Sequence, residues 1–168
     1  CGRMGQKIIK KATKQDDMKI VAAIDRPDVP QAGDDIGEII GIGELGVKLA
    51  GAEKLEEILK KSEPDVLVDF TIAEAAEKNV KTAAKNGVPV VVGTTGFSEK
   101  QKEDMKKAIQ ENKIPAIIAS NMSVGVNVFF KLVEKAAEKL EDYDMELIEA
   151  HHNQKIDSPS GTALTAAE

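Results

Sequence analysis

The sequence predicts an α/β fold in which short parallel strands alternate with amphipathic helices around a doubly wound sheet. Four short apolar runs, rich in β-branched and small residues, have the length and composition of buried strands: 18–24, 65–70, 88–92 and 115–119. Between these runs lie Glu-, Lys- and Ala-rich stretches with apolar residues at helical spacing: 53–61, 73–86 and 98–112. This alternation is typical of a sheet that is covered by helices on both faces and binds ligands at the carboxyl ends of its strands.

Local signals support these element boundaries and extend the order to the end of the sequence. Ser98 with Gln101 fits a capping box at the start of a helix, and Asn86-Gly87 fits a helix stop. The Gly-rich residues 26–51 have weak periodicity, so we expect a long loop with a short strand near 47–49. A longer helix is expected over 126–140, then a strand over 145–150 and a last helix from 160 onward.

Composition argues against several classes of function. The 168 residues carry a formal net charge of −6, which gives no electrostatic case for binding nucleic acid, and aromatic residues make up only 3%. Cys1 is the single cysteine, so an intramolecular disulfide framework and a Cys-rich zinc site are excluded. Nothing resembles a signal peptide or an apolar run long enough to span a bilayer. We therefore expect a cytoplasmic protein that binds neither nucleic acid nor membrane.

The first residues have the features of a phosphate-binding turn. Gly2-Arg3-Met4-Gly5 opens a predicted helix, and Asp25 follows Gly5 by 20 residues at the end of a predicted strand. In a dinucleotide fingerprint, glycine lets the backbone approach a pyrophosphate, the helix N-terminus supplies N–H donors, and the later acid accepts from the adenosine ribose. An ordinary turn with a strand-end carboxylate explains the same residues about as well.

The residue pair at the end of this strand bears on the choice of cofactor. Asp25 can accept from the ribose 2′-hydroxyl of NADH, whereas the neighbouring Arg26 can pair with the 2′-phosphate of NADPH. The sequence therefore predicts that neither cofactor is strongly excluded.

Further small polar segments follow other predicted strands. Gly93-Thr94-Thr95-Gly96 comes after residues 88–92, and residues 120–125, Ser-Asn-Met-Ser-Val-Gly, come after residues 115–119. Hydroxyl and amide side chains at neighbouring strand ends suit a cofactor lying across the sheet, and we favour that reading over plain turns by about two to one. The same holds for residues 69–71, Asp-Phe-Thr.

The segment 149–163 carries the most distinctive chemistry. It reads Glu-Ala-His-His-Asn-Gln-Lys-Ile-Asp-Ser-Pro-Ser-Gly-Thr-Ala and contains both histidines of the chain. Two His, one Lys and a Ser-Gly-Thr turn that leads into a helix provide proton-transfer groups beside an anion site. A metal site is disfavoured, because adjacent histidines rarely converge on one ion and no Cys, Asp or Glu stands at typical zinc spacing. A solvated polar loop is the plain alternative, but the length of this segment between a strand and a helix favours function.

The same segment resembles the motif Glu-Ala-His-His-x-x-Lys-x-Asp-x-Pro-Ser-Gly-Thr-Ala of the 4-hydroxy-tetrahydrodipicolinate (dihydrodipicolinate) reductases. The segments at residues 2–5, 69–71, 93–97 and 120–127 resemble the same family in the same order, so the resemblance covers essentially the whole chain. It implies a homotetrameric enzyme of lysine and diaminopimelate synthesis. Such an enzyme removes water from a cyclic hydroxy-imine dicarboxylate and adds hydride from NADH or NADPH, giving tetrahydrodipicolinate.

The resemblance also implies a role for individual residues. His151 is similar to the general acid/base, and Lys155 to the proton donor paired with it. The groups that hold the dicarboxylate substrate correspond to His152, Gly161 and Thr162. The implied cofactor residues are Gly2, Arg3 and Met4 at the pyrophosphate, Asp25 with Arg26 at the ribose, and Gly93, Thr94, Thr95, Ser120, Asn121, Met122 and Ser123 at the nicotinamide end.

The expected organisation is a Rossmann-like dinucleotide-binding domain over residues 1–125, with its first strand missing, and the start of an α+β substrate-binding and catalytic domain over 126–168. Because the sequence has no initiator Met and stops inside a predicted helix, we expect it to be a segment of a longer protein that is not active alone.

Two rival functions remain open. One is another nicotinamide-dependent reductase, such as a semialdehyde or inositol-type dehydrogenase. The other is a cofactor-sensing or CoA-binding regulatory domain, which would need Gly2 to Gly5 and Asp25 but not His151 or Lys155.

Overall fold

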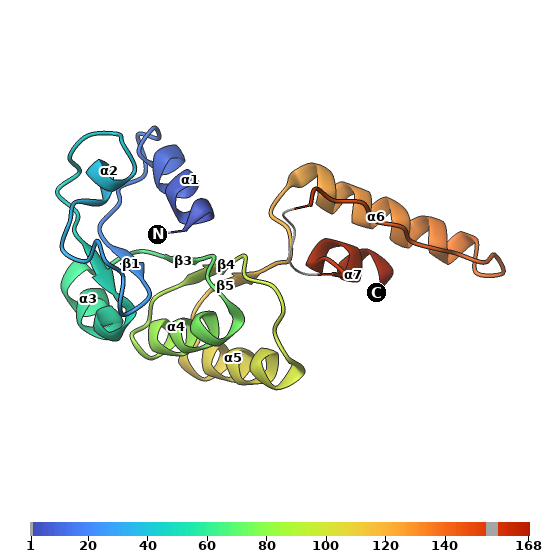
Figure 1. Cartoon of the computed structure of the whole chain (residues 1–168). Coiled ribbons are helices and arrows are strands. Elements are labelled where there is room, and N and C mark those ends of the chain that lie inside the picture. The colour runs from blue at the N-terminus through green and yellow to red at the C-terminus, as the bar shows by residue number, and fades with distance from the viewer. Residues whose placement is uncertain (1, 154–157) are drawn as a thin grey trace. The chain divides into compact units, whose positions relative to one another are not determined.

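The computed structural model describes residues 2–153 and 158–168, which divide into two compact units, Cys1–Ile117 and Ile118–Glu168. The first unit holds almost all of the strands, and the second is built mainly from helices (Figure 1). None of the helices in the described part of the chain has the length and apolarity needed to cross a membrane.

The strands of the first unit form two parallel sheets. Strands β1 (Ala23–Asp25) and β2 (Leu49–Gly51) pair in parallel, and a second sheet has the order β3 (Leu67–Asp69), β4 (Val90–Val92), β5 (Ala116–Ile118). In the second sheet β3 and β4 are parallel, with Leu67 opposite Val90 and Asp69 opposite Val92. The predicted α/β class with parallel strands is confirmed. Among the described residues, β1 and β3 each have one edge along which no other strand lies.

The helices alternate with these strands as the sequence predicts. They are α1 (Arg3–Ala12), α2 (Ile36–Ile39), a short 3₁₀ helix η1 (Ala52–Lys54), α3 (Leu55–Ser62), α4 (Ala73–Lys85) and α5 (Glu99–Asn112). The capping box expected at Ser98 is present: its hydroxyl accepts from Gln101 N at 3.3 Å, and its own N–H donates to Gln101 Oε1 at 2.9 Å. Figure 1 shows α1 and α2 on one side of the strands, and α3, α4 and α5 on the other.

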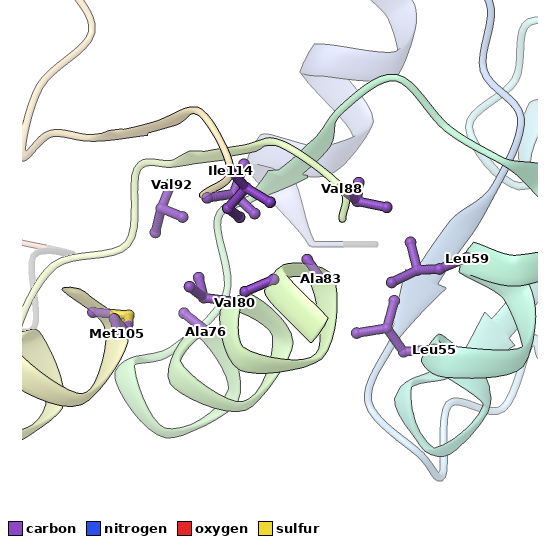
Figure 2. Close-up of a cluster of buried hydrophobic side chains, with 11 residues drawn as sticks. Leu55, Leu59, Ala76, Val80, Ala83, Val88, Val92, Met105 and Ile114 are labelled. Atoms are coloured by element: carbon purple, nitrogen blue, oxygen red, sulfur yellow. The ribbon is translucent and has the colours of Figure 1, made fainter. Parts of the chain in front are cut away.

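Two apolar clusters hold these layers together. The larger one joins α3, α4, α5 and β4, with Val80, Val90, Val92 and Met105 all at most 2% exposed (Figure 2). The smaller one joins α1, α2, β1 and β2 through Ile9, Ala23, Ile36, Ile40 and Leu49. Helices therefore pack on the strands from both sides (Figure 1). Because paired strands run in parallel, the carboxyl ends of β1 and β2 lie at one edge of their sheet, and those of β3 and β4 lie at one edge of theirs.

Two stretches of the first unit differ from the sequence-based expectation. The strand expected over 18–24 is shorter and later, because the residues that pair with β2 are those of β1 (Ala23–Asp25). The expected loop at 26–51 contains α2 (Ile36–Ile39), whose four residues are too few to show a helical period. Asp35 stabilises this helix: its carboxylate accepts from Gly37 N, Glu38 N, Leu45 N and Val47 N at 2.8 to 3.3 Å.

The second unit consists of α6 (Val124–Lys139), α7 (Gly161–Ala167) and the segment between them. Both helices lie within two residues of their expected bounds. The strand expected over 145–150 is wrong, since these residues have no strand assignment and Ile148 is 90% exposed. A strand exists only through pairing with another, and in the described part of this unit no strand lies beside residues 145–150.

Candidate active site

The predicted cofactor residues of the first unit lie in three places: at the start of α1, at the end of β1 and directly after β4. At the start of α1, Gly2 occupies the N-cap position and supplies no side chain to the helix. The first backbone N–H groups of a helix have no partner within it. Gly2, Arg3 and Met4 are exposed, and a Cβ placed on Gly2 would have no atom within 4 Å. Backbone donors at this helix start are therefore open to an anion.

The end of β1 presents an oriented carboxylate. Asp25 Oδ1 accepts from Arg26 N at 2.7 Å, which fixes the acid where the chain leaves the sheet. The Arg26 side chain is exposed, and its Nε lies 3.5 Å from Asp28 Oδ1. An exposed ion pair of this kind contributes about 0–1 kcal/mol, so Arg26 can exchange Asp28 for another anion at little cost.

A buried acid joins the ends of β3 and β4. Asp69 is 3% exposed, and its Oδ1 accepts from Thr71 N at 2.9 Å, Thr71 Oγ1 at 2.7 Å and Thr94 Oγ1 at 3.2 Å. Its Oδ2 accepts from Asn79 Nδ2 on α4 at 2.7 Å. A buried carboxylate is tolerated when hydrogen bonds satisfy it, and these four bonds fix the segments after β3 and β4 against α4.

Directly after β4, position 93 has room only for glycine, because another side chain lies very close to it. A Cβ at Gly93 would lie 2.1 Å from Cε1 of Phe70, far inside van der Waals contact, so the ring of Phe70 occupies the space of a side chain at this position. Thr94 beside it is buried against Asp69, whereas Thr95 is exposed. Of the predicted residues at this strand end, Thr94 is therefore anchored in the protein and Thr95 is accessible.

In the second unit, the predicted cofactor segment contacts α7. Ser120 Oγ lies 2.8 Å from Thr165 Oγ1, and Asn121 Nδ2 donates to Thr162 Oγ1 at 3.2 Å. Ser123 caps α6, its hydroxyl accepting from Val126 N, and Met122 is 40% exposed. The structure thus brings predicted cofactor residues next to Thr162, one of the predicted substrate residues.

An acidic residue, Glu149, connects the predicted catalytic histidine to the start of α7. His151 Nε2 lies 2.7 Å from Glu149 Oε2, and Glu149 Oε1 accepts from Ser160 N at 2.9 Å. Ser160 is buried and caps α7, its hydroxyl accepting from Ala163 N at 2.9 Å. Hydrogen bonds from the Ser160 hydroxyl, from His151 and from the Ser160 backbone lower the pKa of Glu149 from 4.5 to about 2. Glu149 is therefore a carboxylate throughout the neutral range.

The other predicted residues of this segment are placed unequally. His152 is exposed, and Gly161 and Thr162 are the half-buried first residues of α7. Lys155 lies outside the described residues. Within residues 2–153 and 158–168, no group of three or more His, Cys, Asp and Glu residues is placed to hold a metal ion.

Sequence reasoning missed two acids that organise the site. Glu149 begins the motif at residues 149–163, two residues before His151, but nothing in the sequence shows that its side chain also contacts the backbone of Ser160, eleven residues later. Asp69 begins the segment at residues 69–71, yet its contacts with Asn79 and Thr94 depend on how α4 and β4 pack beside β3.

Comparison with known proteins gives one family over the whole chain. Residues 1–122 match the family model "Dihydrodipicolinate reductase, N-terminus", and residues 125–168 match "Dihydrodipicolinate reductase, C-terminus". The chain is 58% identical to the 4-hydroxy-tetrahydrodipicolinate reductase of Methanocaldococcus jannaschii and 60% identical to that of Methanobrevibacter smithii. Each match covers 99% of this chain and 61% of the relative, so the chain spans about three fifths of the length of these relatives.

A solved structure agrees with this result. The dipicolinate-bound dihydrodipicolinate reductase of Paenisporosarcina sp. TG-14 superimposes with a TM-score of 0.75 at 30% identity, covering 99% of this chain and 60% of that one. With the parallel strands, the open start of α1 and the Glu149–His151 pair at α7, these matches show that the chain belongs to the dihydrodipicolinate reductase family.

Proposed function

We propose that the protein carrying this chain reduces 4-hydroxy-2,3,4,5-tetrahydrodipicolinate to 2,3,4,5-tetrahydrodipicolinate with NADH or NADPH. The observation that carries the proposal lies in the second unit. His151, Glu149 and Ser160 form a connected polar cluster at the start of α7, on the segment whose motif resembles that of the family. Relatives at 58% and 60% identity bear the name of this reductase, which supports the same activity here.

The residues of the first unit fit a dinucleotide. The start of α1 offers backbone N–H donors without a capping side chain, as a pyrophosphate requires, and Asp25 offers a carboxylate to ribose hydroxyls. Gly2, Arg3 and Met4 would hold the pyrophosphate, and Asp25 and Arg26 the adenosine ribose. Gly93, Thr94 and Thr95 of the first unit, and Ser120 to Ser123 of the second, would contact the nicotinamide end. When bound, the reduced nicotinamide supplies the hydride.

The second unit supplies the groups that a dicarboxylate imine needs. His152, Gly161 and Thr162 would hold the carboxylates through N–H and O–H donors, and the structure of the TG-14 relative with dipicolinate supports this ligand class. Hydride addition builds electron density on the ring of the substrate, so a proton must meet it. His151 would supply that proton together with Lys155, and water leaves from the hydroxy-imine. In the cell we place this reaction in lysine and diaminopimelate synthesis, carried out by a cytoplasmic homotetramer.

A substrate panel on the intact natural protein tests the proposal. NADH and NADPH oxidation is followed with the cyclic hydroxy-imine, with a semialdehyde and with inositol-type substrates. Turnover of the hydroxy-imine alone is the expected result. Turnover of a semialdehyde or an inositol alone would establish a different reductase, and cofactor binding without turnover of any substrate would establish a regulatory domain.

Variants then assign the chemistry to the second unit. His151→Ala should abolish most turnover while the dissociation constant of NADH, measured by fluorescence, stays unchanged. Asn153→Ala, on the same exposed segment, is the matched control and should retain turnover.

A further inference from the structure

Glu149 is held between two residues that donate hydrogen bonds to it. Its Oε2 lies 2.7 Å from His151 Nε2, and its Oε1 lies 2.9 Å from the backbone nitrogen of Ser160. Its side chain is 22% exposed and that of His151 is 39% exposed, so the contact lies at the surface but is partly shielded. Each carboxylate oxygen therefore has its own partner, on a different segment of the chain.

The chemistry of the carboxylate determines where the proton of the imidazole lies. An ionised carboxylate can only accept hydrogen bonds, and the Ser160 backbone nitrogen can only donate. Glu149 is ionised in the neutral range because its hydrogen bonds lower its pKa to about 2. At 2.7 Å from such an acceptor, His151 Nε2 must carry a hydrogen. In the neutral ring, Nδ1 is then the atom without a proton.

Building on the proposed reductase function, we infer that Glu149 is a positioning residue that holds the proton of His151 on Nε2, so that Nδ1 is the atom that exchanges a proton with the substrate. When Nδ1 is protonated, its N–H bond breaks as the proton passes to the substrate. The ring that remains is neutral and keeps its proton on Nε2.

The second oxygen of Glu149 explains why this residue does more than orient one ring. Ser160 N donates to Glu149, while the Ser160 hydroxyl caps α7 by accepting from Ala163 N. The residues that follow Ser160 are Gly161 and Thr162, the proposed substrate residues. One carboxylate therefore fixes the imidazole relative to the first turn of α7.

The exposure of His151 to water determines how much turnover should fall when Glu149 is neutralised. In a buried serine-protease triad, replacing the acid by its amide lowers turnover by about 10⁴-fold, because the imidazole is trapped in the wrong tautomer. Loss of the hydrogen-bond partner of a metal-bound histidine lowers metal affinity or activity by about 10- to 100-fold. Water reaches His151 and lets the ring exchange tautomers, so we expect a loss of turnover of about 10- to 100-fold when Glu149 is neutralised.

Glu149→Gln is the sharpest variant, because an amide has one accepting oxygen and one donating nitrogen. If the oxygen accepts from Ser160 N, the amide nitrogen faces His151 Nε2, which must then accept. The proton should move to Nδ1. In the intact natural protein, nitrogen-15 NMR of the imidazole, recorded where the ring is neutral, should show Nε2–H in the wild type and Nδ1–H in Glu149→Gln. The turnover number should fall about 10- to 100-fold, with the dissociation constant of NADH unchanged.

Controls separate this role from a structural one. Glu146→Gln removes the same charge from an exposed residue three positions earlier and should change neither the tautomer nor turnover. Equal losses in the two variants, or an unchanged tautomer in Glu149→Gln, would overturn the inference. The wild-type spectrum needs no variant: a wild-type His151 with its proton on Nδ1 overturns the inference even if Glu149→Gln fails to fold. If the wild type holds Nε2–H but does not turn over the hydroxy-imine, the proposed function fails while the assigned tautomer stands.

Discussion

Gly93→Ala should destabilise the protein through one contact that the structure defines. The added methyl group would lie 2.1, 2.4 and 2.7 Å from three atoms of the Phe70 ring, so the ring or the chain after β4 must move. The backbone of Gly93 does not lie in the left-handed region, so steric overlap with Phe70, and not backbone strain, is the expected cause. Overpacking of this kind costs about 1–3 kcal/mol.

Thermal unfolding of the intact natural protein measures this cost. For an unfolding unit of about 150–250 residues, 1 kcal/mol corresponds to roughly 2–4 °C in Tm, so Gly93→Ala should lower the Tm of the domain that carries it by roughly 2–12 °C. Cofactor affinity should fall as well, because Phe70 and Gly93 follow the ends of β3 and β4. Gly125→Ala is the matched control: a Cβ there would have its nearest contact at 3.8 Å, and alanine favours helix α6, so Tm should stay the same or rise.

A double variant supplies the decisive comparison. In a Phe70→Ala background the ring is absent, so adding Gly93→Ala should cost almost nothing, and the coupling between the two sites should equal the cost of the single variant. An unchanged Tm for Gly93→Ala, or an equal loss in both backgrounds, would refute the reasoning from this contact.

Four further outcomes are expected. His151→Ala or Lys155→Ala should lower turnover by about 10²- to 10⁴-fold with cofactor binding unchanged, as stopped-flow reduction and NADH titration would show; normal turnover would remove the residue from catalysis. The wild-type protein should bind NADH and NADPH with affinities within about tenfold of each other, because the opposing contacts of Asp25 and Arg26, ~1–2 kcal/mol each, nearly cancel. Arg26→Ala should weaken the binding of NADPH selectively, and more at low salt, because Arg26 readily exchanges its exposed pair with Asp28 for the 2′-phosphate. Equal effects on both cofactors would contradict this. The 168-residue chain alone should self-associate in light scattering, because β1 and β3 each have an edge without a neighbouring strand in the described residues; a monomer with cooperative melting would count against it. The pKa of Glu149 is about 2 in the folded protein, below its usual value of 4.5, so its ionised form contributes stability that is present above about pH 4.5 and is lost as pH falls towards 2. Glu149→Gln should therefore flatten the acid side of the plot of Tm against pH, and an unchanged plot would contradict this.

Several elements of the fold were predictable because their signals are local. The capping box at Ser98 depends on two side chains three residues apart, and the four apolar runs needed only their β-branched composition to mark the strands β1, β3, β4 and β5. Helix α2 was missed because its stability comes from Asp35 bonding to Leu45 and Val47, ten and twelve residues away. The strand expected at 145–150 failed for a related reason, since composition favours an extended chain but only a partner strand makes it part of a sheet.

The sequence by itself determined the order of strands and helices, the polar segments after the strands and the motif that contains both histidines, because each is carried by neighbouring residues. Only the tertiary structure decided which of these polar groups touch. The hydrogen bonds from Asn79 and Thr94 to Asp69, the space at Gly93 filled by Phe70 and the bond from Ser160 N to Glu149 all join residues that are ten or more positions apart in the chain. Such contacts depend on strand register and helix packing, which are properties of the folded chain and not of any single segment of its sequence.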